Sequence, residues 1–177
     1  MAEIKPPAPV KLFVGILTAR RELLDAAREK LVTRYGAVDC ETESMPFAFT
    51  DYYEREMGAP LVKKFWSFEK LIQPEFLAKI KYETNVIESG FVVPGAARPV
   101  NLDPGYLTLA KVVLATAKDF PHRIYIGDGI YAEVTLFYEK EKWRANAWTY
   151  PDYRQEKYHD FFNRMRGALL SQLRSIQ

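Results

Sequence analysis

The order of apolar patterns along residues 11–103 is the feature that most restricts how this chain can fold. Lys11 to Thr18 is nearly continuous in apolar residues, as in a strand buried on both faces. Apolar residues at helical spacing follow from about Arg20 to Tyr35, and Gly36 supplies a stop. The start of the chain therefore predicts a buried strand followed by a helix.

The segments that follow add two strands, a second helix and a short strand. Residues 37–43 and 61–72 are predicted strands, Pro74 begins a helix that stops near Gly90, and residues 100–103 are a short strand. The succession β-α-β-β-α-β is that of the ferredoxin-like split βαβ arrangement. We therefore predict an α+β fold with a ferredoxin-like βαββαβ core.

The last seventy residues are expected to extend this core. Thr108 can cap a helix to about Asp119, although the β-branched content leaves a strand as the alternative. Residues 122–126, 130–139 and 142–149 alternate as an antiparallel β-meander. A long C-terminal helix follows, with Asp152 as its cap. Its buried stripe is expected to comprise Tyr158, Phe161, Phe162, Met165, Leu169 and Leu173.

The meander has one register that separates apolar from polar side chains. With Gly127–Gly129 as a three-residue loop, Tyr125 pairs with Tyr131 and Arg123 pairs with Glu133, whereas His122 falls on the apolar face. The polar face then gathers Arg123, Tyr125, Tyr131, Glu133, Thr135, Arg144, Asn146 and Trp148. Such a face is either a solvated sheet surface or the floor of a ligand pocket.

Residues 101–106 (NLDPGY) have the composition of a type II turn. Pro104 presets φ near −65°, and Gly105 accepts the positive φ that the next position needs. A turn of this kind would hold the side chains of Asn101 and Asp103 in fixed places, as a binding site requires. A second polar and aromatic segment, residues 50–60, is expected to be irregular.

These segments together define a candidate ligand site. Lys118 and Arg123 can hold a phosphate or a carboxylate, and Trp148 can stack on a planar group. The complete set is Asp51, Tyr52, Asn101, Asp103, Lys118, Arg123, Tyr131, Glu133, Asn146 and Trp148. No nucleophile or acid–base pair stands at a recognisable spacing, so the sequence does not decide whether the protein is an enzyme.

Cofactor chemistry has little support in the sequence. Cys40 is the only cysteine, which excludes a disulfide framework and a thiolate metal site. The carboxylates of residues 51–56, with Asp103 or Glu133, could bind a divalent cation through oxygen. Carboxylates at such loose spacing are more often solvated loop charges, and we expect no cofactor.

Composition bounds the class of protein. The 177 residues, 48% of them apolar, suit a single domain over residues 11–177 after a disordered lead-in over residues 1–10. A net charge of +2 gives no argument for a nucleic-acid or membrane partner. We expect a cytoplasmic protein, whose oligomeric state the sequence does not set.

Several motifs carry a resemblance to a known family. They are PFAFTDYYEREMG, SFEKLI, the K-x-x-T-N-x-x-E spacing from Lys81 to Glu88, VNLDPGYL, LATAK, HRIYIGDGIYAEVTL and TYPDYR. Over essentially its whole length the chain resembles a bacterial and archaeal family of unknown function, which has no established activity or catalytic residues to carry over. Some relatives carry the label "GTP-binding protein". The chain has no G-x-x-x-x-G-K-[ST] loop, D-x-x-G switch or N-K-x-D guanine reader.

Two functions from different classes fit these observations. The first is a small-ligand-binding protein, or an enzyme, that takes a phosphorylated or carboxylated small molecule. The alternative is a non-catalytic interaction module that presents Tyr125, Tyr131 and Trp148 to a protein or RNA partner. A deep pocket joining Asp51, Asp103 and Glu133 would favour the first function, and a flat aromatic face would favour the second.

Overall fold

Strand β1 (Val10–Thr18) is the centre of the molecule. In the computed structural model, which describes residues 3–92 and 98–176, all nine residues of β1 are buried. It pairs antiparallel with β4 (Leu61–Ile72) on one side and with β5 (Val100–Leu107) on the other. The strands predicted at residues 11–18 and 61–72 are therefore confirmed. Of the expected lead-in, residues 1 and 2 lie outside the described part, and residues 3–9 form no helix or strand.

The described strands form one sheet with the order β2-β4-β1-β5-β6-β8-β7, in which β3 also pairs with β4 and β9 with β8. Their other bounds are β2 (Val38–Glu41), β3 (Met45–Phe47), β6 (Lys111–Thr116), β7 (Ile124–Gly127), β8 (Ile130–Glu139) and β9 (Lys142–Ala145). The molecule is thus a mixed α and β protein with a large antiparallel sheet, larger than a four-stranded core.

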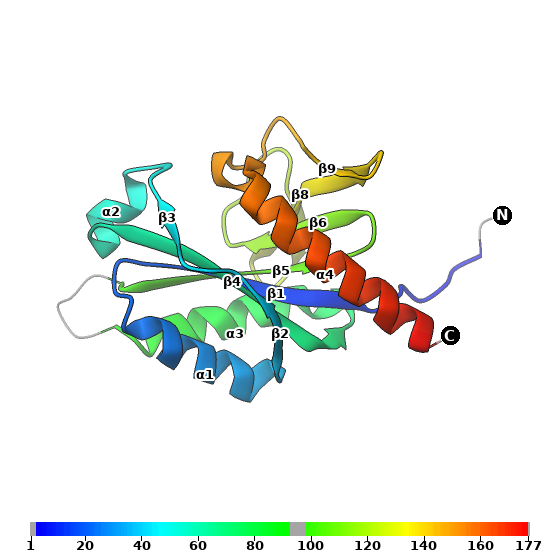
Figure 1. Cartoon of the computed structure of the whole chain (residues 1–177), viewed down its shortest axis with the longest axis horizontal. Helices are drawn as coiled ribbons and strands as arrows, with labels where there is room; N and C mark the ends of the chain where they lie inside the picture. Colours follow the sequence, from blue (N-terminus) through cyan, green and yellow to red (C-terminus); the bar gives the residue numbers. More distant parts are fainter. Residues whose placement is uncertain (1–2, 93–97, 177) are drawn as a thin grey trace.

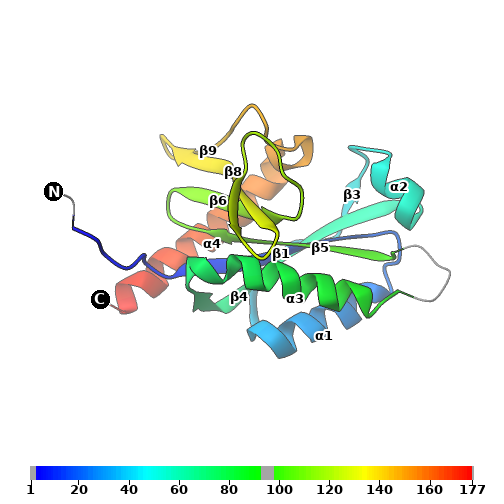
Figure 2. The same ribbon diagram turned by 180° about the vertical axis from the view of Figure 1, so that it is seen from behind.

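Helices cover both faces of the sheet because β1 alternates between two apolar layers. Leu12, Val14 and Ile16 pack in one cluster with α1 (Leu23–Tyr35) and α3 (Leu77–Ser89). Figures 1 and 2 show these two helices lying together beneath the sheet. A 3₁₀ turn, η1 (Pro74–Phe76), precedes α3, as expected of a proline at a helix start.

The C-terminal helix α4 (Glu156–Ser175) covers the opposite face, where Phe13 and Phe65 meet its aromatic stripe. The stripe predicted for this helix is confirmed, with Leu173 packed at its margin. The predicted cap is wrong, because Asp152 lies in a separate 3₁₀ turn, η2 (Pro151–Arg154). Gln155 has ψ of 141°, which separates this turn from α4.

Of the two alternatives for residues 108–119, the helix is wrong and the strand is confirmed, because β6 (Lys111–Thr116) occupies this segment. It lies between β5 and β8, where both of its faces are covered. Val112 and Leu114 contribute to the cluster under α4, whereas Val113 and Ala115 contribute to a cluster with α3 residues. Two apolar faces at a period of two suit a central strand better than an amphipathic helix.

The type II turn predicted at residues 101–106 is also wrong. These residues continue β5, and Pro104 lies opposite Val14 of β1. The pairing with β6 starts only at Gly105, after the proline. A Cβ atom at Gly105 would lie 2.5 Å from the Val113 carbonyl oxygen and 2.6 Å from Phe13 Cζ. Close packing therefore requires this glycine, and the backbone does not turn.

The meander register is largely confirmed. Tyr125 pairs with Tyr131 as expected, and Tyr138 pairs with Trp143. The first loop differs, because Gly127 pairs with Ile130 after a bulge. Asp128 and Gly129, at φ 52° and 74°, are then a two-residue turn. Strand β7 begins at residue 124 and β9 ends at residue 145, so both are shorter than predicted.

The segment expected to be irregular at residues 50–60 contains a short helix, α2 (Tyr52–Met57), which packs Met57 against Phe47 of β3. In the described residues no helix is both long enough and apolar enough to cross a membrane.

Two glycines test the crowding at β5. We expect Gly105→Ala to destabilise the protein by about 1–3 kcal/mol, because the added methyl forces backbone and ring apart. Gly167, inside α4, has open space around its missing Cβ. Gly167→Ala should therefore stabilise by about 0.5–1 kcal/mol. Urea unfolding measures both values, and equal effects of the two substitutions would contradict the strand assignment at Gly105.

Candidate functional site

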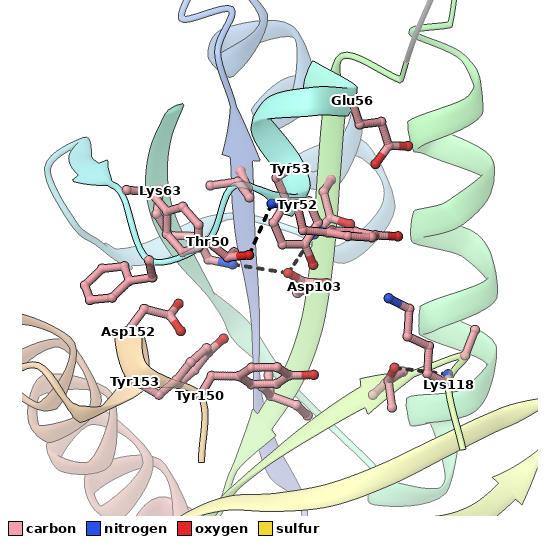
Figure 3. A pocket seen from close by; sticks show the side chains of 18 of the residues that line it. Thr50, Tyr52, Tyr53, Glu56, Lys63, Asp103, Lys118, Tyr150, Asp152 and Tyr153 are labelled. Atoms are coloured by element: carbon pink, nitrogen blue, oxygen red, sulfur yellow. Dashed lines mark hydrogen bonds and ion pairs between the residues drawn. The ribbon is translucent and has the colours of Figure 1, made fainter. Parts of the chain in front are cut away.

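A cavity of about 660 Å³ lies where several chain segments meet (Figure 3). Residues from β5, α3 and the end of β6 line it together with Tyr150 and the η2 turn, and the residues around α2 complete the lining. The volume is within the range of small-molecule sites. Its surface mixes aromatic and charged side chains. The aromatic ones are Phe47, Phe49, Tyr52, Tyr53, Tyr150 and Tyr153, and the charged ones are Glu56, Lys63, Lys81, Glu88, Arg98, Asp103, Lys118, Glu133 and Asp152.

Asp103 is the centre of the charged network in this cavity. Its Oδ2 accepts hydrogen bonds from Lys63 Nζ at 3.1 Å and from Asn101 Nδ2 at 2.7 Å. Its Oδ1 lies 3.8 Å from Lys81 Nζ. Burial alone would raise the pKa of Asp103, but Lys63, Lys81 and Asn101 together lower it below the ordinary value. The site therefore holds Asp103 as a carboxylate.

Lys63 reaches Asp103 from β4 across the central strand, and a glycine makes the crossing possible. Gly15 of β1 pairs with Phe65 on one side and with Asp103 on the other. A Cβ atom at Gly15 would lie 3.0 Å from Lys63 Cε and 2.8 Å from the Phe65 ring. The lysine itself is only 3% exposed. Its charge is thus buried at the cavity wall, with Asp103 as its ion-pair partner.

A second set of ion pairs joins α3 to α2. Lys81 of α3 donates to the Leu102 carbonyl at 2.8 Å, and Glu88 accepts from the Leu102 amide at 2.6 Å. Burial raises the pKa of Glu88 despite these partners. Arg98 bridges Glu88 at 3.0 Å and Glu56 of α2 at 3.1 Å. Lys81 and Glu88, at the two ends of the K-x-x-T-N-x-x-E motif, are therefore buried against β5.

The two residues that precede β7 contact the Glu133 carboxylate. Arg123 Nε donates to it at 2.8 Å, and His122 Nε2 lies 3.2 Å away. The pairing of Arg123 with Glu133 was expected, but His122 does not lie on the apolar face. Because β7 starts only at residue 124, strand alternation does not extend to His122, which stacks on Trp148 at 5.3 Å between ring centroids.

The η2 turn places two buried polar groups on the cavity wall. Asp152 is 6% exposed, and burial raises the pKa of its carboxyl above the ordinary value. Tyr153 is 2% exposed, and its hydroxyl has no hydrogen-bond partner in the described residues. Figure 3 shows both side chains extending toward the cavity. Buried polar groups of this kind point to a ligand or to water.

The residues proposed from the sequence divide into two sets. Five line the cavity: Tyr52, Asn101, Asp103, Lys118 and Glu133. The other five are Asp51, Arg123, Tyr131, Asn146 and Trp148, which are not among its lining residues. Arg123 contributes indirectly by contacting Glu133 and the Tyr150 hydroxyl. Asn146 and Trp148 both donate to the Val134 carbonyl and so fix the end of the meander.

Sequence reasoning missed several lining residues, and two of them carried a signal. Lys63 and Lys64 are adjacent in a strand, so their side chains point to opposite faces and one of the two lysines has to lie against a packed layer. Asp152 looked fully explained as a helix cap, and the structure removes that explanation. Arg98 and Tyr153 offered no pattern, since their role depends on contacts between distant segments.

Carboxylates do not gather here as they would for a metal. In the described ranges no three His, Cys, Asp or Glu side chains are arranged to hold an ion. Asp103 and Glu133 contact Lys63 and Arg123 instead.

The comparisons with known proteins agree with the resemblance seen in the sequence. Residues 8–168 match the family described as Domain of unknown function (DUF4416). This α and β protein with a charged interior cavity therefore belongs to that family. Searches of curated proteins and of solved structures found no match.

Removing the Asp103 carboxylate tests the charged network. We expect Asp103→Ala to cost about 3–5 kcal/mol, because it leaves Lys63 buried without its counter-charge. Asp51→Ala, at an exposed position outside the cavity, should change stability by no more than about 0.5 kcal/mol. Urea unfolding of the two variants gives both numbers.

The difference in free energy of unfolding between wild type and Asp103→Ala should depend on pH in a defined direction. Folding lowers the pKa of Asp103 below 3.8, so its stabilisation is present above that value and is lost as the pH falls through the lower native value. The difference in free energy of unfolding between wild type and Asp103→Ala should therefore become smaller in strong acid. A difference in free energy of unfolding that becomes larger in acid would contradict the ion-pair assignment.

Proposed function

We propose that the protein binds a small anionic molecule, phosphorylated or carboxylated, in the cavity beside Lys118. One observation carries this proposal. Among the described residues, Lys118 is the one lining cation with no carboxylate within ion-pair distance, because Lys63, Lys81 and Arg98 are all paired. An unpaired cation at the wall of a concave site supports binding of an anion.

The surroundings of Lys118 favour a ligand with a flat apolar part. Its Nζ lies 4.7 Å from the centroid of the Tyr52 ring. Its backbone amide donates to Thr116 Oγ1 at 3.2 Å, which fixes the chain at the end of β6. Tyr53 and Phe49 also line the cavity, each in an edge contact with Phe47. Aromatic walls of this kind supply contact area at little entropic cost.

The cavity could also support a reaction on its ligand. Burial raises the pKa of Asp152, whereas the lysines and Asn101 lower the pKa of Asp103. Two carboxyl groups with pKa values moved apart are a common arrangement for proton transfer. Binding of the anion rests on Lys118, and an enzymatic role rests on these two carboxyl groups.

We also propose that the core is ferredoxin-like. The strand order β2-β4-β1-β5, with α1 and α3 packed on one face, supports this assignment. The cytoplasmic location expected from the sequence stays a prediction.

Protein binding at β7 is a second candidate function. This edge strand exposes Ile124 and Tyr125 at 72% and 59%. An uncharged strand edge can pair with another chain. Trp148 is 42% exposed and stacks on His122, just before this strand.

A thermal-shift screen tests the proposed ligand class. The panel comprises nucleotides, sugar phosphates and dicarboxylates, each beside its uncharged parent compound. A true ligand at about one hundred times its Kd stabilises the fold by about 2.7 kcal/mol, which raises the melting temperature by several degrees. The uncharged parents should give a smaller rise.

The matched variants are Lys118→Ala and Lys157→Ala, the latter at an exposed position on α4. Only the first should abolish the shift. No stabilisation by any anion, or a shift that survives in Lys118→Ala, would overturn the proposal and leave binding at β7 as the better candidate.

A further inference from the structure

Among the described residues, two charged groups of opposite sign line the cavity without an ion-pair partner. Lys63 and Lys81 contact Asp103, Arg98 contacts Glu56 and Glu88, and Glu133 contacts Arg123. In the part of the chain that the structure describes, the lining charges without an ion pair are Lys118 and Asp152. A ligand that complements the whole site therefore needs a second charged group.

We infer that the ligand carries an amine as well as its anionic group, with the amine at Asp152 and the anion at Lys118. This inference rests on the proposed function, since it assigns the other end of the same ligand. The substrate class is an amino-phosphate or an amino-carboxylate. Asp152, Tyr153 and Lys118 are the residues that would recognise it.

The Asp152 end has the properties of an amine site. Its carboxyl is almost fully buried, and a buried carboxylate is costly unless a cation or several donors approach it. The adjacent Tyr153 hydroxyl is buried and unpartnered, and oxygen of a hydroxyl accepts hydrogen bonds from an ammonium group. The Tyr158 hydroxyl and the backbone amides of Asp152 and Tyr153 already approach this carboxyl, but among the described residues no cation lies within ion-pair distance of it. An ammonium group of the ligand would supply that charge and donate to the Tyr153 hydroxyl oxygen as well.

The two ends belong to one continuous cavity. Asp152, Tyr150 and Lys118 all line it, and in Figure 3 Tyr150 lies between the other two. The Tyr150 hydroxyl accepts a hydrogen bond from Arg123 at 2.6 Å, which holds the ring in place. A planar group between the amine and the anion would meet this ring and the aromatic wall near Tyr52.

Three probes of one shape test the inference by isothermal titration calorimetry. They are 4-(2-aminoethyl)phenyl phosphate, its 4-ethylphenyl phosphate analogue without the amine, and tyramine, which lacks the phosphate. The aminated phosphate should bind about tenfold more tightly than the ethyl analogue, because a hydrogen bond to a charged group adds this much. Tyramine should bind more weakly than the aminated phosphate.

Variants of the protein test which residues bind each end of the ligand. Asp152→Asn keeps the side-chain shape and should bring the two phosphates to nearly equal affinity, while Tyr153→Phe should reduce the ratio in part. Lys118→Ala should weaken both phosphates and leave their ratio unchanged. A fourth probe, 4-(2-hydroxyethyl)phenyl phosphate, tests a hydroxyl in place of the amine.

The outcomes separate the inference from the function it rests on. Equal binding of the aminated and ethyl phosphates, both weakened by Lys118→Ala, overturns the amine site and keeps the anion site. Stronger binding of the hydroxyethyl probe than of the aminated one also overturns it. Binding of neither phosphate overturns both proposals.

Discussion

The pairing of Asp103 with Lys63 is the interaction on which the site depends. It crosses the central strand at Gly15, the one residue of β1 that leaves room for a lysine chain. Lys81 approaches the same carboxylate from α3 and also binds the Leu102 carbonyl. The charges therefore tie two strands, β4 and β5, and helix α3 together across β1, where ordinary packing would place apolar groups.

Much of the fold could be predicted because its signals are local. The strands at residues 61–72 and 130–139 have the predicted bounds, and the stripe of α4 follows helical spacing over its length. The errors arose where a local signal was outweighed by distant contacts. Pro104 and Gly105 have turn composition, but Val14 and Val113 flank them in a continuous sheet.

The site was less accessible to sequence reasoning for the same physical reason. Glu133 was found as a polar residue on one face of a predicted strand, whereas Asn101 and Asp103 were chosen through a predicted turn that is in fact strand β5. Lys63 belongs with them only because the register of β4 and β5 on β1 brings it to Asp103. Asp152 was interpreted as a cap, and its burial beside Tyr153 follows from the packing of η2 against the aromatic core.

The most direct consequence of this arrangement is that the pKa values of two carboxyl groups shift in opposite directions. Asp103 has lysines on two sides, whereas burial dominates at Asp152. Carboxyl ¹³C NMR across an acid titration measures both groups, with Asp103→Asn and Asp152→Asn providing the assignments. The pKa of Asp103 should fall below 3.8 and that of Asp152 should lie above it. An Asp103 carboxyl that titrates above Asp152 would contradict the charged network that defines the site.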